Sequence, residues 1–227
     1  MGKATVKRIV CGIMFNPSFS ILDEWGKIAD TLLYNTSKKS PGFSSRYFPT
    51  ISQQYTTSRF LSNQDLGHSL ELTSNNLIYT HTIQNDFESE YKEFISRVEK
   101  CLIPKIIDKY ALITRRIGMV YICEMDNTSI SSFKQQYFSK SSEITDCRFA
   151  IRTTTPEGLA FSGNDNYVNK IYTVGSIDDA IQGISFDYQL YFQPPQPEIT
   201  SKITSFFETS KKCFFEEIFN EEYCGKR

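Results

Sequence analysis

The segment ISFDYQLYF, residues 184–192, alternates apolar and polar side chains with a period of two. Successive side chains of a β-strand point to opposite faces, so this alternation predicts a strand with one apolar and one polar face. Such strands are typical of antiparallel sheets that are covered on one side. The side chains expected to face the core are Ile184, Phe186, Tyr188, Leu190 and Phe192.

Two longer segments carry apolar side chains at both odd and even positions, so both faces of the predicted strands are apolar. Residues 5–15 do so along their whole length, which is typical of a strand at the centre of a sheet. Residues 113–122, with the sequence ITRRIGMVYI, have the same character but contain Arg115 and Arg116. Adjacent strand residues face opposite sides, so both arginines cannot point outward. We treat them as candidate structural or ligand-binding residues.

Helical periodicity separates the predicted strands. Apolar side chains recur at helical spacing, and Pro104 is expected to kink or end the second of the predicted helices. These helices cover residues 20–34, 87–102 and 198–223, with a short one near 127–137. The predicted fold class is therefore α+β, a single domain over residues 1–227 with antiparallel sheets and helices packed on one face.

A constant offset of 108 residues relates the first strand and helix to a later pair. It places Arg8 and Ile9 on Arg116 and Ile117 without a gap. The offset predicts an internal repeat of strand–helix–strands–helix halves, at residues 1–110 and 111–227. The alternative is chance, because any two strands that are followed by a capped helix resemble each other.

Charge and composition exclude several classes of protein. The 25 Lys and Arg residues nearly balance the 26 Asp and Glu residues, so no global field attracts nucleic acid or an acidic membrane. No apolar run approaches the ~20 residues that a membrane-spanning helix needs, and the first residues read as a strand rather than a signal peptide. The six cysteines form no C-x-x-C pair. We therefore expect a soluble cytoplasmic protein with reduced thiols.

The strand RRIGMVYI also carries a family resemblance. Together with a first strand that ends at Phe15 before a proline, and the blocks SLELTSNNLIYTH and FESEYKEFISRV, it resembles a sporadically distributed, uncharacterised prokaryotic family. That family is marked by an Arg-x-Gly-x-x-Tyr strand, which Arg116, Gly118 and Tyr121 match, although Val120 replaces a frequent second arginine. The resemblance implies an α+β fold, no assigned chemistry and genes in defence-type clusters. It also implies that Arg116 is the more buried arginine and bonds an acidic side chain or backbone carbonyls.

Few residues indicate catalytic chemistry. His68 and His81 should lie near each other on one face of a hairpin, but the sequence places no third metal ligand beside them. We therefore favour polar members of a half-buried sheet face. A cysteine nucleophile and a carboxylate-metal nuclease are weaker alternatives, and no phosphate-binding glycine loop occurs. Their candidate residues are Cys11, Cys123 and Cys147, and Asp126, Asp146, Asp165 and Asp187.

Arginines and lysines lie among aromatic residues on or beside the predicted strands. A sheet face of this kind can stack single-stranded bases and bind phosphates. The neutral overall charge weakens that interpretation, and the alternative is that aromatic residues fill the core while arginines pair with nearby acids. The residues concerned are Lys7, Arg8, Arg46, Arg59, Arg115, Arg116, Arg148, Arg152 and Lys170.

The closing helix has an apolar face wider than one sheet usually covers. The excess predicts an interface with a partner or a second copy, whereas the alternative is that all the phenylalanines pack inside one subunit. The candidate interface residues are Phe206, Phe207, Phe214, Phe215 and Phe219.

These observations favour a non-catalytic binding, accessory or sensor subunit of a prokaryotic defence or toxin–antitoxin-like system that acts through protein–protein contacts. We expect no enzyme activity, no cofactor and no metal. The expected partner is the product of a neighbouring gene or a second copy of the chain, with nucleic acid less favoured and no membrane. The alternatives are a hydrolase or nuclease with a dispersed His/Asp site and a single-stranded nucleic-acid binder.

Overall fold

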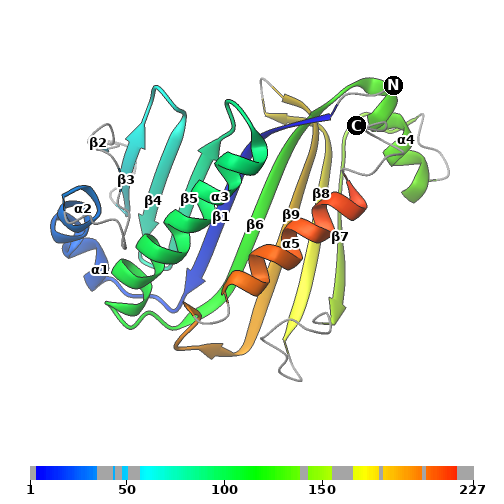
Figure 1. Ribbon diagram of the computed structural model, residues 1–227. Coiled ribbons are helices and arrows are strands. Elements are labelled where there is room, and N and C mark those ends of the chain that lie inside the picture. Colours follow the sequence, from blue (N-terminus) through cyan, green and yellow to red (C-terminus); the bar gives the residue numbers. More distant parts are fainter. Residues whose placement is uncertain are drawn as a thin grey trace.

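A single antiparallel sheet dominates the protein (Figure 1). The computed structural model describes residues 4–34, 43, 48–50, 57–138, 143–154, 166–178, 181–200 and 203–218. Within these ranges, nine strands pair in the order β2-β3-β4-β5-β1-β6-β9-β8-β7, always antiparallel. The strands are β1 (Ala4–Phe15), β2 (Phe48–Thr50), β3 (Ser58–Asn63), β4 (His68–Thr73), β5 (Asn76–Thr82), β6 (Thr114–Met125), β7 (Cys147–Thr154), β8 (Tyr167–Asp178) and β9 (Ile181–Gln196).

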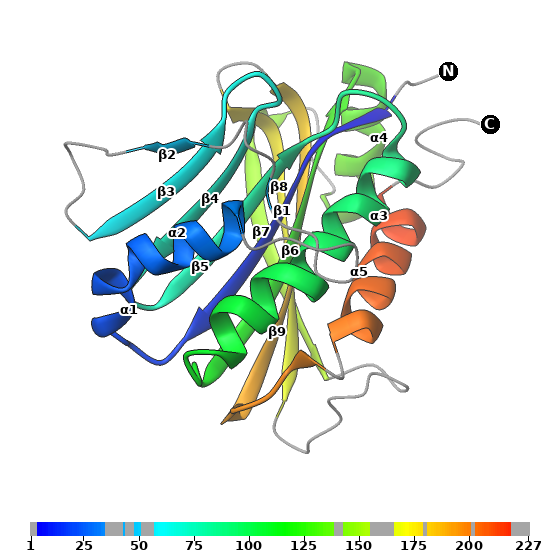
Figure 2. The ribbon, with the colours of Figure 1, turned by 60° about the vertical axis from the view of Figure 1, so that its left-hand side comes forward.

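The described helices all pack on one face of this sheet (Figures 1 and 2). In that part of the chain, none of them combines the length and apolar character needed to cross a membrane. The helices are α1 (Ser20–Asp23), α2 (Trp25–Leu33), α3 (Phe87–Arg97), its continuation η1 (Val98–Asp108), α4 (Asn127–Tyr137) and α5 (Ile203–Glu217).

The core lies between the sheet and this helical layer. The alternation of β9 is confirmed, because its five predicted core residues are at most 3% exposed. On the central strands, Ile9 and Cys11 of β1 and Ile117 and Tyr121 of β6 point to the same covered side. The predicted α+β class, with antiparallel sheet and helices on one face, is confirmed.

Both halves of the chain follow the same element order. A strand (β1 or β6) is followed by one or two helices, further strands and a long helix. The sheet order outward from the centre is β1-β5-β4-β3 on one side, with the short β2 added at the edge, and β6-β9-β8-β7 on the other. Cys11 pairs directly with Met119, the residue onto which the offset of 108 places it. The central pair therefore has the register of a twofold repeat, and a common origin of the halves stays a prediction.

Pro104 does not end the second long helix. The chain continues from α3 as the π-helical segment η1, which contains this proline and runs to Asp108. Proline lacks the amide that helical hydrogen bonding needs, and the wider π-helical turn accommodates it. Six apolar side chains of η1 are buried, so packing against the core favours the continuation.

Candidate functional site

Two histidines stack on the covered side of the sheet. His68 starts β4 and His81 lies near the end of β5, where the hairpin places them as neighbours. Their ring centroids are 3.8 Å apart with planes inclined by 24°. Both side chains are buried, with 5% and 1% exposure. The proximity predicted from the hairpin pattern is confirmed.

Helix α3 adds a third polar side chain, Glu90. Asp86 caps this helix by accepting a hydrogen bond from the Ser89 amide at 2.8 Å, which fixes the first turn. Glu90 then reaches back, and its Oε1 accepts from the amides of Asn85 at 2.6 Å and Gln84 at 3.1 Å. Its Oε2 lies 3.1 Å from Nε2 of His81. The sequence offered no clear signal for this, since the glutamate of a capping box lies three residues after the cap, whereas Glu90 lies four residues after Asp86.

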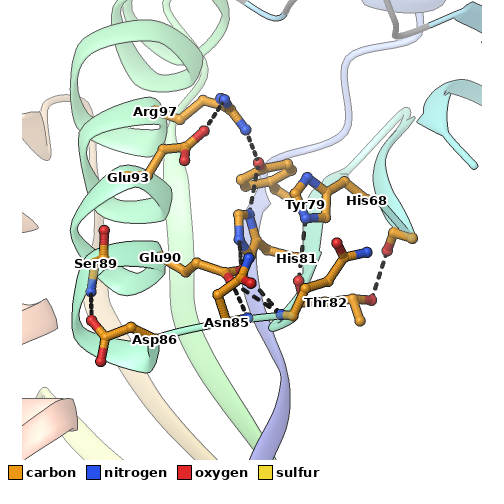
Figure 3. A network of polar contacts seen from close by, with 12 residues as sticks. His68, Tyr79, His81, Thr82, Asn85, Asp86, Ser89, Glu90, Glu93 and Arg97 are labelled. Carbon is orange, nitrogen blue, oxygen red and sulfur yellow. Dashed lines mark hydrogen bonds and ion pairs between the residues drawn. The ribbon is translucent and has the colours of Figure 1, made fainter. Parts of the chain in front are cut away.

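Tyr79 and Arg97 complete the network around His81 (Figure 3). Arg97 donates to the Tyr79 hydroxyl at 2.6 Å and to Glu93 at 2.6 Å. The Tyr79 hydroxyl lies 3.4 Å from Nδ1 of His81, so both ring nitrogens of this histidine face a polar group. On the other ring, Nε2 of His68 lies 3.3 Å from the Thr82 carbonyl oxygen.

The surroundings fix the charge state of this cluster. Burial, followed by the nearby His81, lowers the pKa of His68 to about 4, and burial also lowers the pKa of His81. For Glu90, burial acts to raise the pKa, but hydrogen bonds from the Asn85 amide and His81 outweigh it and lower the pKa. At neutral pH the two imidazoles are therefore uncharged and Glu90 is ionised.

A small hollow opens beside the cluster. It has a volume of about 150 Å³ and is lined by Leu66, His68, His81, Gln84, Asn85, Glu90 and Glu93. The donor atoms of His68, His81 and Glu90 all lie within 4.8 Å of one another. Across the described residues, this is the one group of three or more His, Cys, Asp or Glu side chains close enough to hold a metal ion.

The other chemical candidates do not converge on this cluster. Asp126 caps α4, and Asp146 accepts a hydrogen bond from the Ser176 amide. Cys11 and Cys123 are buried, and burial raises the pKa of Cys11 to about 12, so this thiol is protonated. Asp165 lies outside the described residues.

The opposite face of the sheet is the second candidate site. No described helix covers it (Figure 2). Arg116 of β6, Tyr191 of β9 and Tyr167 of β8 occupy directly paired positions there. The Arg116 guanidinium lies 5.7 Å from the Tyr191 ring centroid, the two tyrosine rings stack at 4.7 Å, and the Arg152 guanidinium lies 4.3 Å from the Tyr167 ring. We call these four side chains the arginine–tyrosine row.

The two adjacent arginines separate as expected but with a different partner. Arg116 is half-buried and Arg115 is exposed, which confirms Arg116 as the more buried of the pair. The prediction that Arg116 bonds an acidic side chain or backbone carbonyls is wrong, because its guanidinium donates to the Tyr191 hydroxyl at 3.4 Å. Strand alternation turns Arg116 to the uncovered face, where Tyr191 stands beside it. Its Nε is buried and makes no hydrogen bond within the described part of the chain.

The middle of this uncovered face is apolar and carries no side chain at two paired positions. Gly12 and Gly118 pair at the centre of the sheet, and a side chain added at Gly12 would meet no atom within 4 Å. Strand alternation places Val10, Val120 and Ile122 around them. Amide side chains of Asn169 and Gln189 lie between this apolar floor and Arg152.

The closing helix does not offer its phenylalanines to a partner as expected. Phe206, Phe207 and Phe214 are at most 1% exposed because they pack against the sheet and α3 within the same chain. Phe214, for example, stacks on Tyr121 with centroids 4.4 Å apart. Phe215 is partly buried against Phe87, and Phe219 lies outside the described residues. The interface prediction is thus wrong for the three buried residues.

Comparisons with known proteins give little further information. No family model and no curated protein matches the chain. Among solved structures, the chain is similar to "Methanococcus jannaschii TBP", with 9% sequence identity, 92% of this chain and 99% of that chain covered, and a TM-score of 0.26. A TM-score this low does not establish a common fold. The resemblance to the prokaryotic family stays a prediction.

Proposed function

We propose that the protein is a non-catalytic binding protein that holds single-stranded nucleic acid on the uncovered face of its sheet. The observation that carries this proposal is the arginine–tyrosine row, in which two stacked tyrosines lie between two arginines across β6, β9, β8 and β7. The family resemblance adds the expectation that this binding serves a prokaryotic defence system.

The tyrosines of the row orient Arg116 and Arg152 for contact with an anionic ligand. Each guanidinium packs on a tyrosine ring, which limits its motion and leaves N–H groups to donate to phosphate oxygens. Arg116 has a buried Nε without a hydrogen-bond partner among the described residues, and Arg152 uses its Nε on Asn169 at 3.1 Å, which leaves its terminal nitrogens. A ligand with several phosphates matches this arrangement.

Charge on the uncovered face supports the same ligand. Strand alternation places Arg8 and Arg148 on this face as well. The acidic side chains there are engaged: Glu71 accepts from Ser58 at 3.0 Å, and Glu124 pairs with Lys7 at 2.8 Å. Asp187 accepts a hydrogen bond from Gln189, and burial, as the largest effect, raises the pKa of its carboxyl. The near-neutral chain thus carries a locally basic surface.

The apolar floor favours a single strand over a duplex. A duplex presents phosphates and sugars, which would leave Val10, Val120 and Ile122 without contacts. A single strand exposes its bases, which cover apolar and aromatic surface while the phosphates bind arginines. Beside them, the Asn169 oxygen accepts from Arg152, and the buried Gln189 amide bonds Asp187 and the Tyr191 hydroxyl, so these two amides hold the row in place.

Fluorescence anisotropy tests this proposal. The probes are a labelled single strand of mixed sequence, as DNA and as RNA, and the matching duplex. We expect the single strand to bind more tightly, and Arg116→Ala with Arg152→Ala to weaken it at least ~10-fold. Because each phosphate contact on a single strand contributes a slope of about −0.7 to log K against log salt, the double variant should lose about 1.4 of that slope.

The matched control is the pair Lys92→Ala with Lys212→Ala, which removes the same charge from the helical side. Equal weakening by both pairs would mean that net charge alone attracts the nucleic acid, and the proposal would fail. A wild type that binds no oligonucleotide but captures a protein encoded beside its gene would instead favour the protein-partner interpretation.

A further inference from the structure

We infer that His68, His81 and Glu90 form a binding site for a divalent transition metal, with Zn²⁺ the ion best matched to the donors. The site lies on the covered side of the sheet, and it is independent of the proposed nucleic-acid surface on the opposite side. The sequence alone lacked a third ligand beside the two histidines, and α3 supplies it.

The donor atoms have the spacing that a small ion needs. Two donors that each lie ~2.05 Å from a tetrahedral zinc ion are ~3.3 Å apart. His81 Nε2 and Glu90 Oε2 are 3.1 Å apart, and the three ligand atoms lie within 4.8 Å of one another. For all three donors to reach one ion, the His68 ring must turn out of its stack on His81, in which the ring planes are inclined by 24°.

Each proposed ligand is held by a second group. Two backbone amides hold Oε1 of Glu90, which leaves Oε2 directed to His81. When Nε2 of His81 binds the ion, its Nδ1–H donates to the Tyr79 oxygen, which Arg97 also contacts. When Nε2–H of His68 donates to the Thr82 carbonyl, Nδ1 carries the lone pair for the metal. Supporting contacts of this kind orient the histidines of known metal sites.

The hollow beside the cluster gives access and room for another ligand. Its volume of about 150 Å³ exceeds the ~30 Å³ share of one water molecule. Two histidines, one glutamate and a water is a donor set that zinc adopts in proteins. The alternative is a polar cluster that satisfies its own hydrogen bonds without a metal, because His81 already donates to Glu90 in the structure.

Metal binding to the purified full chain distinguishes these two interpretations. Zn²⁺ affinity is measured by competition with a chromophoric chelator, and Co²⁺ replaces zinc for absorption spectroscopy. We expect one zinc per chain and an intense four-coordinate cobalt spectrum. Loss of a supporting contact alone typically costs ~10–100-fold in metal affinity, so His81→Ala or Glu90→Gln should cost at least ~100-fold.

The matched control is Glu88→Gln, which changes a carboxylate on the same helix that pairs with Lys211 away from the hollow. It should leave zinc affinity unchanged. Tyr79→Phe should weaken zinc about 10-fold while the cobalt spectrum stays four-coordinate, because it loses only a supporting contact.

The inference fails if wild type binds zinc no more tightly than Glu90→Gln, or if cobalt gives a weak six-coordinate spectrum. X-ray absorption of the zinc-loaded wild type provides a test that needs no variant. It should show two imidazole nitrogens in the first shell, and a shell without histidine would overturn the site even if the variants do not fold.

Discussion

His81 depends on neighbours that come from three separate elements. Its own strand supplies Tyr79, β4 supplies His68, and α3 supplies Glu90. A histidine in such a position is buried as the neutral imidazole, because the charged form would lose its hydration. Protonating His68 or His81 therefore requires more free energy in the folded chain than in the unfolded chain.

In metal-free protein, we expect the free energy of unfolding to decrease as the pH falls from about 7 towards 4. The unfolded chain protonates His68 near the ordinary pKa of 6.5, whereas the folded chain holds this pKa at about 4, chiefly through burial. The unfolded state thus binds more protons in this window, so stability is complete above pH ~6.5 and is lost down to the folded pKa. The lowered pKa of Glu90 acts in the same direction at lower pH.

Urea unfolding at several pH values, with a chelator present, measures this dependence. His68 borders the hollow, so we expect a loss of about 2 kcal/mol rather than the full value of the shift. In His68→Gln, the free energy of unfolding should depend less on pH between pH ~6.5 and ~4.5. A variant with the wild-type slope would show that other groups cause the dependence.

Helix α5 shows why an amphipathic pattern did not reveal which residues meet a partner. Its aromatic face is wide, but the sheet and α3 together cover more of it than one sheet would. Tyr91 of α3 contacts both Tyr121 of β6 and the Phe207 carbonyl, so α3 and β6 enclose the helix from two sides. Helical periodicity predicts the width of the apolar face but not the number of elements that pack on it.

Phe214 and Phe215 provide the corresponding prediction. Phe214→Ala should lower the free energy of unfolding by about 3–5 kcal/mol, because it removes a fully buried ring stacked on Tyr121. Phe215→Ala should cost clearly less, since this ring is only partly buried against Phe87. Chemical denaturation measures both values. Equal costs, or a change of oligomeric state in Phe214→Ala by light scattering, would restore the interface interpretation.

At the scale of the whole molecule, local periodicity was enough to predict most of the fold. Strand alternation indicated the central strands and the covered side of β9, and the offset of 108 agrees with the register of β1 and β6. The sites depend on long-range contacts that periodicity does not encode. Glu90 meets the histidines only because α3 crosses the hairpin, and Tyr191 meets Arg116 only because β9 pairs with β6.

The same topology predicts whether a ligand crosses the centre of the sheet. Gly12 lies on β1 at the junction of the two halves, and a new side chain there would project from the uncovered face without a clash. We expect Gly12→Glu and Gly12→Gln to fold with stabilities within about 1 kcal/mol of the wild type, since glycine has no conformational advantage in a strand.

These two variants differ in charge but have nearly the same shape. If a nucleic acid passes from the arginine–tyrosine row over the glycines, Gly12→Glu should weaken single-strand binding more than Gly12→Gln, and added salt should reduce the difference because it screens repulsion from phosphates. Anisotropy titrations at two salt concentrations measure both effects. Unchanged affinity in both variants, with Arg116→Ala still impaired, would confine the ligand to the half of the sheet formed by β6, β9, β8 and β7.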